Sequence, residues 1–221
     1  MKLLELFSGT CSVGMPWREA GHEVLSLDID GRYNPEIVCD ILHWSYCKCE
    51  VPDVIWASVP CEQYSRARTT GRRPRNFELA DSLVAKASEI IQYFLRSNPA
   101  LLWFIENPDS SLLWRRDVAS EFAPYVRLDY CQYGTAYRKR TRVATNVVWV
   151  PRPLCDQACH ACVDGRHVLT AQRGPGKKGG VRTRSGEDGC SLDQLHGLPR
   201  DLCEEILRVC EGHQWEMMEQ K

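Results

Sequence analysis

The sequence predicts an α/β fold, a doubly wound and mostly parallel sheet that carries a small Cys/His-rich insertion. Short apolar runs alternate with helical stretches from residue 1 to about residue 150, an order typical of sheets built from strand–helix–strand units. The chain has 221 residues, 43% hydrophobic and 26% charged. This is enough for one such domain with a small appendage, and it excludes wholesale disorder.

The strands are predicted from apolar runs that are bounded by turn-forming or polar residues. The four expected parallel strands are residues 2–7, 23–29, 53–59 and 101–106. Two further runs, residues 126–130 and 141–150, are separated by a basic loop. We expect these two to form an antiparallel edge of the sheet.

The helices are predicted from apolar residues that recur at helical spacing. Residues 13–20 predict a short helix. Residues 77–96 predict a longer one that ends at Asn98-Pro99. Residues 192–207 predict a helix near the C-terminus.

The composition changes near residue 151 and divides the chain into three parts. Residues 1–150 carry the strand and helix pattern, and we expect them to form one α/β domain. Residues 151–190 are rich first in Cys and His and then in Gly and basic residues, without a core-forming period, which predicts a small separate module. Residues 191–221 are expected to return to the first domain as a helical segment.

The overall charge excludes a global polycation, because 28 Lys and Arg balance 29 Asp and Glu to a net charge of −1. The basic residues instead gather in residues 66–75, 138–142 and 173–184. No apolar run has the length of a membrane span, and Gly and Ser interrupt the N-terminal segment too early for a signal peptide. We therefore expect an unsecreted protein of the cytoplasm or nucleus. Its twelve cysteines are then expected to be reduced thiols, some of them in a metal site and one of them catalytic.

The segment ELFSGTCSVG (5–14) predicts a strand, a glycine-containing turn and a helix. Ligands of parallel sheets bind beyond such strand ends. Asp28, at the end of the next strand, is placed to accept hydrogen bonds from ribose hydroxyls, and Asp40 could bind an adenine amine. The pyrophosphate fingerprint G-x-G-x-x-G is absent, so a nucleoside ligand such as S-adenosylmethionine fits better. An ordinary tight turn is the alternative.

Two side chains at predicted strand ends are candidates for catalysis. Cys61 follows Pro60 after the strand 53–59, and the arginines that come next would favour its thiolate. Glu106 ends the hydrophobic strand 101–106, where burial should raise its pKa and suit it to act as a general acid. A buried structural cysteine and a solvated glutamate are the alternatives.

A row of arginines forms a further candidate site. On a strand, Arg138, Arg140 and Arg142 would share one face, where guanidinium groups can bind phosphate or position a carboxylate. A solvated basic hairpin is the alternative.

These motifs in their order resemble the DNA cytosine-5 methyltransferase family. The segments are FSGTCSVG (7–14), VPC (59–61), ENP (106–108) and R-x-R-x-R (138–142). The family has F-x-G-x-G, P-C, E-N-V and Q-x-R-x-R in the same order. The resemblance covers about residues 1–150, with a fainter match between LDQLHGLP (192–199) and the family's L-Q-G-F-P. The paired P-C and E-N segments are its specific part.

The resemblance implies a sheet of the S-adenosylmethionine-dependent methyltransferase type, a reaction and the residues that carry it. Cys61 would attack carbon 6 of a cytosine flipped out of double-stranded DNA, and Glu106 would protonate or hydrogen-bond ring nitrogen 3. Arg140 would support the flipped base and the glutamate, and the methyl group would go to carbon 5. The residues expected to line the S-adenosylmethionine site are Phe7, Gly9, Thr10, Cys11, Ser12, Val13, Asp28, Ile29, Asp40, Ile41 and Pro60.

The sequence departs from the family pattern at several positions. Pro108 replaces the valine of E-N-V, and Cys11 replaces the second glycine of the first motif. A large target-recognition domain and the segment G-N-x-V-P are missing, as in minimal viral or phage relatives. Two other functions therefore stay open. One is the same chemistry on cytosine in RNA or on a modified base, and the other is a catalytically silent, zinc-containing DNA-binding module.

The Cys/His-rich segment predicts a structural zinc site. Cys155-x3-Cys159-x2-Cys162-x4-His167 offers four ligands at suitable spacing, with His160 as a competitor. Zinc would fold a stretch that has no hydrophobic core of its own. Free thiols in a loop are the alternative. The basic stretch 173–184 follows directly and is the candidate DNA contact in place of a recognition domain.

Overall fold

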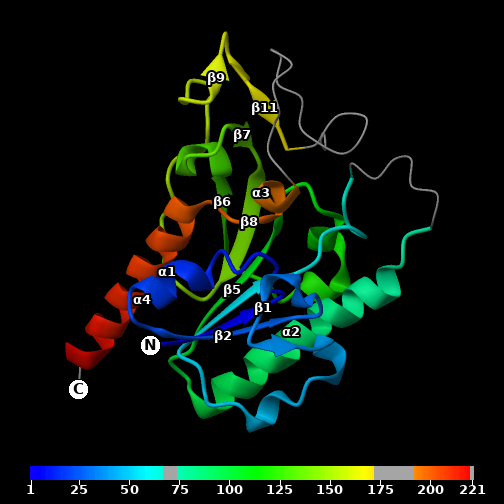
Figure 1. Cartoon of the computed structure of the whole chain (residues 1–221), viewed down its shortest axis with the longest axis vertical. Helices are drawn as coiled ribbons and strands as arrows, with labels where there is room; N and C mark the ends of the chain where they lie inside the picture. The colour runs from blue at the N-terminus through cyan, green and yellow to red at the C-terminus, as the bar shows by residue number, and fades with distance from the viewer. Residues whose placement is uncertain (67–73, 172–191, 220–221) are drawn as a thin grey trace.

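A computed structural model of the chain describes residues 1–66, 74–171 and 192–219. Seven strands form one sheet in the order β3-β2-β1-β4-β5-β8-β6 (Figure 1). The strands are β1 (Lys2–Leu6), β2 (Glu23–Asp28), β3 (Ile37–Val38), β4 (Val54–Ser58), β5 (Leu102–Pro108), β6 (Tyr125–Asp129) and β8 (Arg140–Thr145). The first five pair in parallel, and β8 lies antiparallel between β5 and β6. The predicted mostly parallel sheet is confirmed.

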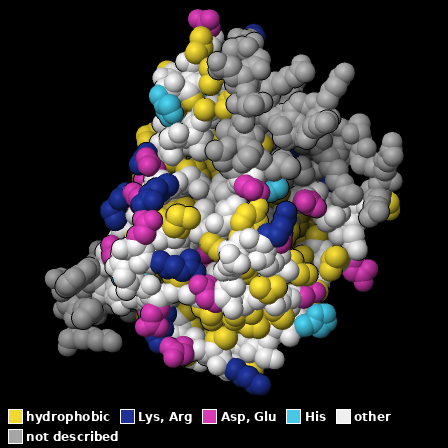
Figure 2. Space-filling view, in the orientation of Figure 1, with side chains coloured by type: hydrophobic (Ala, Val, Ile, Leu, Met, Phe, Trp, Pro, Cys, Tyr) yellow, Lys and Arg dark blue, Asp and Glu magenta, His cyan; other side chains and the backbone are white. Residues whose placement is uncertain are grey.

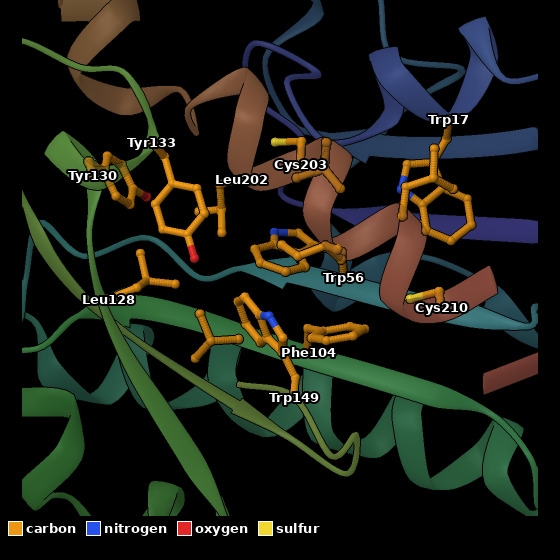
Figure 3. Packing of buried hydrophobic residues seen from close by; sticks show 14 of the residues in the cluster. Trp17, Trp56, Phe104, Leu128, Tyr130, Tyr133, Trp149, Leu202, Cys203 and Cys210 are labelled. Atoms are coloured by element: carbon orange, nitrogen blue, oxygen red, sulfur yellow. The ribbon is translucent and has the colours of Figure 1, made fainter. Parts of the chain in front are cut away.

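Helices cover both faces of this sheet, because side chains alternate along each strand. On one face, α1 (Gly14–Glu19) and α4 (Arg200–Glu219) share a buried cluster with Trp56 and Phe104, whose rings stack with centroids 5.5 Å apart (Figure 3). On the other face, α2 (Phe77–Ser97) packs against the residues of the opposite parity. The predicted helices 13–20 and 77–96 are confirmed.

The remaining short elements connect the sheet and extend one end of the molecule (Figure 1). There, β7 (Tyr137–Arg138) pairs with β11 (Leu169–Thr170), and β9 (Cys162–Val163) pairs with β10 (Arg166–His167). The helix α3 (Leu192–His196) precedes α4. The 3-10 turns among the described residues are η1 (Gly31–Tyr33), η2 (Ile41–His43), η3 (Tyr46–Lys48), η4 (Leu112–Arg115), η5 (Asp117–Ala119) and η6 (Tyr130–Tyr133).

Two predicted elements have different bounds in the structure. The strand expected over 141–150 ends at Thr145, because the Asn146 side chain then bonds to the Trp103 amide (2.9 Å) and the Leu101 carbonyl (2.9 Å). The helix expected over 192–207 is interrupted, because Gly197 and Pro199 separate α3 from α4. Among the described helices, none is long and apolar enough to cross a membrane.

Charges of both signs mix on the surface. In Figure 2, Lys and Arg side chains lie beside Asp and Glu rather than in one patch of a single sign. Ion pairs such as Arg200 with Glu19 and Arg18 with Glu36 account for part of this pattern. The basic stretch 173–184 and residues 67–73 of the arginine-rich segment lie outside the described residues.

Candidate active site

The thiol of Cys61 and the carboxyl of Glu106 lie at the carboxyl edge of the sheet, on neighbouring segments. Parallel pairing of β4 with β5 puts Ser58 opposite Glu106, and Cys61 follows three residues after Ser58. The Asn107 side chain donates a 2.7 Å hydrogen bond to the Val59 carbonyl. The P-C and E-N segments are therefore tied directly to each other.

Burial controls the protonation of this pair. Glu106 is 6% exposed, and burial raises the pKa of its carboxyl. The Lys139 charge and hydrogen bonds from the Tyr130 hydroxyl (3.4 Å) and the Ser58 hydroxyl oppose that rise in pKa. Burial also raises the pKa of the Cys61 thiol, Lys139 lowers it and the Glu106 charge raises it. The site therefore favours a protonated carboxyl, and one cation favours the thiolate.

The structure does not bring Arg140 to this pair. Glu106 stands opposite Val143 on β8, so Arg140 belongs to the other face of the strand. Its guanidinium donates to both carboxylate oxygens of buried Asp129, at 3.0 and 2.7 Å. Among the described residues, Lys139, whose ammonium lies 4.8 Å from the centre of the Tyr130 ring, is the cation whose charge lowers the pKa of Cys61 and Glu106. Nothing in the local pattern of residues 138–142 distinguishes Lys139 from its neighbours.

The predicted cofactor turn has an unusual backbone. Phe7, Gly9 and Cys11 have φ values of 57°, 46° and 54°, which is the left-handed region. The carboxylate of Asp28 accepts hydrogen bonds from the Gly9 and Asp30 amides, both at 2.8 Å. A Cβ added at Gly9 would meet no atom within 4 Å, so open space lies beside the turn. Asp28 thus joins the ends of β1 and β2 at the place expected for a ribose.

A buried carboxyl that the sequence analysis missed supports the same turn. The two carboxylate oxygens of Glu5 accept hydrogen bonds from the Val13 amide (3.2 Å) and the Gly14 amide (3.0 Å) at the start of α1. Burial raises the pKa of Glu5 to about 7, although both amide hydrogen bonds lower it. The signal in the sequence is one acidic residue inside the apolar run KLLELF.

The other predicted cofactor residues differ in what they can offer a ligand. The side chains of Val13 and Ile41 are buried in the core, so only their backbones could contact a ligand. Ile29 is 70% exposed, and Asp40 accepts a 3.0 Å hydrogen bond from the Leu42 amide. Pro60 is exposed beside Cys61.

A pocket of about 520 Å³ adjoins the cofactor turn. Thr10 and Ser12 line it together with Asp193, Leu198 and other residues of the C-terminal segment. The Leu198 amide donates a 3.0 Å hydrogen bond to the Ser12 hydroxyl. The segment that resembles L-Q-G-F-P therefore packs directly on this turn.

The predicted metal ligands come together at the end of β6. The Nε2 atom of His167 lies 3.5 Å from Cys155 Sγ, 3.4 Å from Cys159 Sγ and 3.6 Å from Cys162 Sγ. The structure adds Cys131, which the spacing pattern did not include because it lies 24 residues before Cys155. We call these five residues the thiol cluster.

The fold and the paired P-C and E-N segments define a methyltransferase. No family model matches the chain. A protein of Frog virus 3 (isolate Goorha) named "Probable DNA (cytosine-5)-methyltransferase" is 32% identical over 207 residues, covering 82% of this chain and 92% of that protein. The chain belongs to the DNA (cytosine-5)-methyltransferase family.

Solved structures of methyltransferases are also similar to the chain. A mutant of Spodoptera frugiperda DNMT2 is 20% identical with a TM-score of 0.42, over 70% of this chain and 53% of that one. The Dnmt2 methyltransferase of S. pombe is 15% identical with a TM-score of 0.42, over 74% of this chain and 57% of that one. The chain thus spans somewhat more than half the length of these two structures.

Proposed function

We propose that the chain transfers a methyl group from S-adenosylmethionine to carbon 5 of cytosine in DNA, through a covalent adduct at Cys61. The observation that carries the proposal is the Cys61 thiol beside the buried Glu106 carboxyl, with their segments joined by the Asn107–Val59 hydrogen bond. A nucleophile and a general acid on neighbouring strand ends suit addition to a base ring. The name of the Frog virus 3 relative supports DNA as the polymer.

The ring is activated by the two side chains together. The Cys61 thiolate forms a bond to carbon 6 while Glu106 gives its proton to nitrogen 3, which leaves carbon 5 electron-rich. S-adenosylmethionine, when bound, supplies the methyl group as a cation equivalent. A base then removes the proton from carbon 5, the sulfur–carbon 6 bond breaks toward Cys61, and the nitrogen 3 proton returns to Glu106. A raised pKa at Glu106 keeps the required proton in place near neutral pH.

The residues near the turn fit S-adenosylmethionine. The Asp28 carboxylate is fixed by two amides at the edge of the sheet, and the space beside Gly9 is open. Asp28 would hold the ribose hydroxyls, exposed Ile29 would contact the adenine, and Asp40 would accept from its amine. A ribose-binding acid and a close backbone approach are what a nucleoside without a diphosphate needs.

Lys139 takes the place that the resemblance gives to Arg140. Its charge lowers the pKa of both Cys61 and Glu106. The ammonium therefore stabilises the thiolate before attack and the carboxylate after proton transfer. The proposal includes a division of the chain into a catalytic domain (1–150), a module (151–190) and a returning segment (191–221). It also includes a cytosine that is flipped out of duplex DNA, in the cytoplasm or nucleus.

Mass spectrometry of nucleosides tests the proposal. Duplex DNA incubated with the protein and S-adenosylmethionine should acquire 5-methylcytosine, and Cys61→Ser should abolish it. Cys47→Ser, which changes an exposed cysteine, is the matched control and should retain activity. DNA containing 5-fluorocytosine should form a stable adduct with the wild type, because a base cannot remove fluorine from carbon 5 as it removes a proton, so the sulfur–carbon 6 bond cannot break. Activity that survives Cys61→Ser would overturn the covalent mechanism, and 5-methylcytidine in RNA alone would replace DNA as the substrate.

A further inference from the structure

The thiol cluster has the dimensions of a metal site. Ligands of a tetrahedral zinc ion, with Zn–S near 2.3 Å and Zn–N near 2.0 Å, lie about 3.5 to 3.8 Å from one another. The contacts of Cys155, Cys159 and Cys162 with His167 measure 3.4 to 3.6 Å, and Cys159 Sγ lies 3.6 Å from Cys162 Sγ. Donors are therefore gathered at the distances that one ion would impose.

A second feature is the backbone around the sulfurs. The Gln157 amide donates a 3.3 Å hydrogen bond to Cys155 Sγ, two residues earlier. The Ala161 amide makes the same kind of bond to Cys159, also two residues earlier. These two amides hold the Cys155 and Cys159 sulfur atoms in a fixed orientation. Gln157 has a φ of 74°, so the chain adopts an uncommon conformation to make the first of these bonds.

Cys131 is the member of the thiol cluster that belongs to residues 1–150. Its Sγ and the ligand atoms of Cys155, Cys159 and His167 all lie within 4.8 Å of one another. Cys131 is fully buried in η6, immediately after β6, whereas Cys162 is partly exposed. A buried ligand from a fixed element suits a closed structural site, because it needs little ordering when the metal binds.

We propose that the chain binds one structural zinc ion through Cys131, Cys155, Cys159 and His167, so that the ion fastens the segment 151–170 to the catalytic domain. Three soft sulfur donors with one imidazole select zinc over the hard cations calcium and magnesium. Cys162 Sγ lies 3.6 Å from both Cys159 Sγ and His167 Nε2, outside the group of four donors that includes buried Cys131.

The zinc site adjoins the strand pair next to the active site. Asp129, two residues before Cys131, accepts a 3.0 Å hydrogen bond from the Cys155 amide. The same buried carboxylate holds Arg140, which directly follows Lys139. One carboxylate thus joins the metal-binding segment to the start of β8. We expect the bound ion to fix the position of this strand end.

Metal analysis of the full-length protein tests the inference, and its readout does not depend on methyl transfer. Protein purified without chelators should contain one zinc per chain. Cys131→Ala should weaken zinc affinity, measured by competition with a chromogenic chelator, by roughly 100-fold or more, since even the loss of a residue that only hydrogen-bonds to a metal ligand costs about 10–100-fold. Cys210→Ala, at another fully buried cysteine, is the matched control and should leave the affinity unchanged. Metal-free wild type, or unchanged affinity in Cys131→Ala, would overturn the proposal.

A second variant covers the case in which Cys131→Ala does not fold. Cys162→Ala should keep one zinc per chain, because Cys162 lies outside the proposed ligand set. Loss of the ion from Cys162→Ala would show that the four ligands are Cys155, Cys159, Cys162 and His167, and would overturn the role of Cys131.

Discussion

The side-chain amide of Asn107 donates a 2.7 Å hydrogen bond to the main-chain carbonyl of Val59. Asn107 is fully buried and directly follows Glu106, while Val59 lies two residues before Cys61. This one bond therefore links the segment that carries the acid to the segment that carries the nucleophile. Its strength should matter more for the reaction than for the stability of the fold.

We expect Asn107→Ala to lower kcat for methyl transfer by about 100-fold, because small displacements of reacting groups have effects of this size. Asn146→Ala is the matched control, since Asn146 donates a similar 2.9 Å bond to the Leu101 carbonyl at the opposite end of β5. Steady-state kinetics and thermal melts of both variants would separate the two effects. Equal losses of kcat in the two variants would contradict a positioning role.

Lys139→Met should shift the reactivity of Cys61 to higher pH. The Lys139 charge lowers the pKa of the Cys61 thiol, so its removal leaves less thiolate at any given pH. The rate of Cys61 alkylation by iodoacetamide, followed against pH by peptide mass spectrometry, measures this directly. Lys139→Arg should restore the wild-type profile, and an unshifted profile in Lys139→Met would exclude the interaction.

Asp28→Asn should weaken binding of S-adenosylmethionine by about tenfold, or ~1.4 kcal/mol. An amide oxygen can replace only one of the two carboxylate oxygens that accept the Gly9 and Asp30 amides. Isothermal titration calorimetry gives the affinity. Asp30→Asn is the control, because the Asp30 carboxylate faces the exposed Arg32. Unchanged affinity in Asp28→Asn would remove Asp28 from the cofactor site.

The free energy of unfolding should fall between pH 4.5 and pH 7 because of Glu5. Its pKa rises from 4.5 to about 7 on folding, so the folded protein holds a proton that the unfolded chain releases. The contribution of Glu5 to the free energy of unfolding is complete below pH 4.5 and is lost as the pH rises to about 7. At about 1.4 kcal/mol per pKa unit, the loss is roughly 3 kcal/mol. Urea titrations of wild type and Glu5→Gln at several pH values test this. Parallel stability–pH curves would contradict it.

The sheet, its main helices and the segments of the active site could be predicted from the sequence, because apolar periodicity and motif order are local properties. The zinc hypothesis also used local spacing, and Cys131 escaped it because only the fold brings this residue near Cys155. Whether Lys139 or Arg140 faces Glu106 depends on strand register, because a one-residue shift would exchange the two faces of the strand. The end of β8 depends on the Asn146 side chain reaching Leu101 and Trp103 across the sheet.

The packing of α4 has a consequence for synthesis of the chain. Leu202, Cys203 and Ile206 of α4 complete the cluster that contains Trp17 and Trp56. On a ribosome, that side of the sheet therefore stays uncovered until α4 leaves the exit tunnel. During this interval the nascent protein exposes two large indole rings to water, and chaperones that bind apolar segments would have access to them.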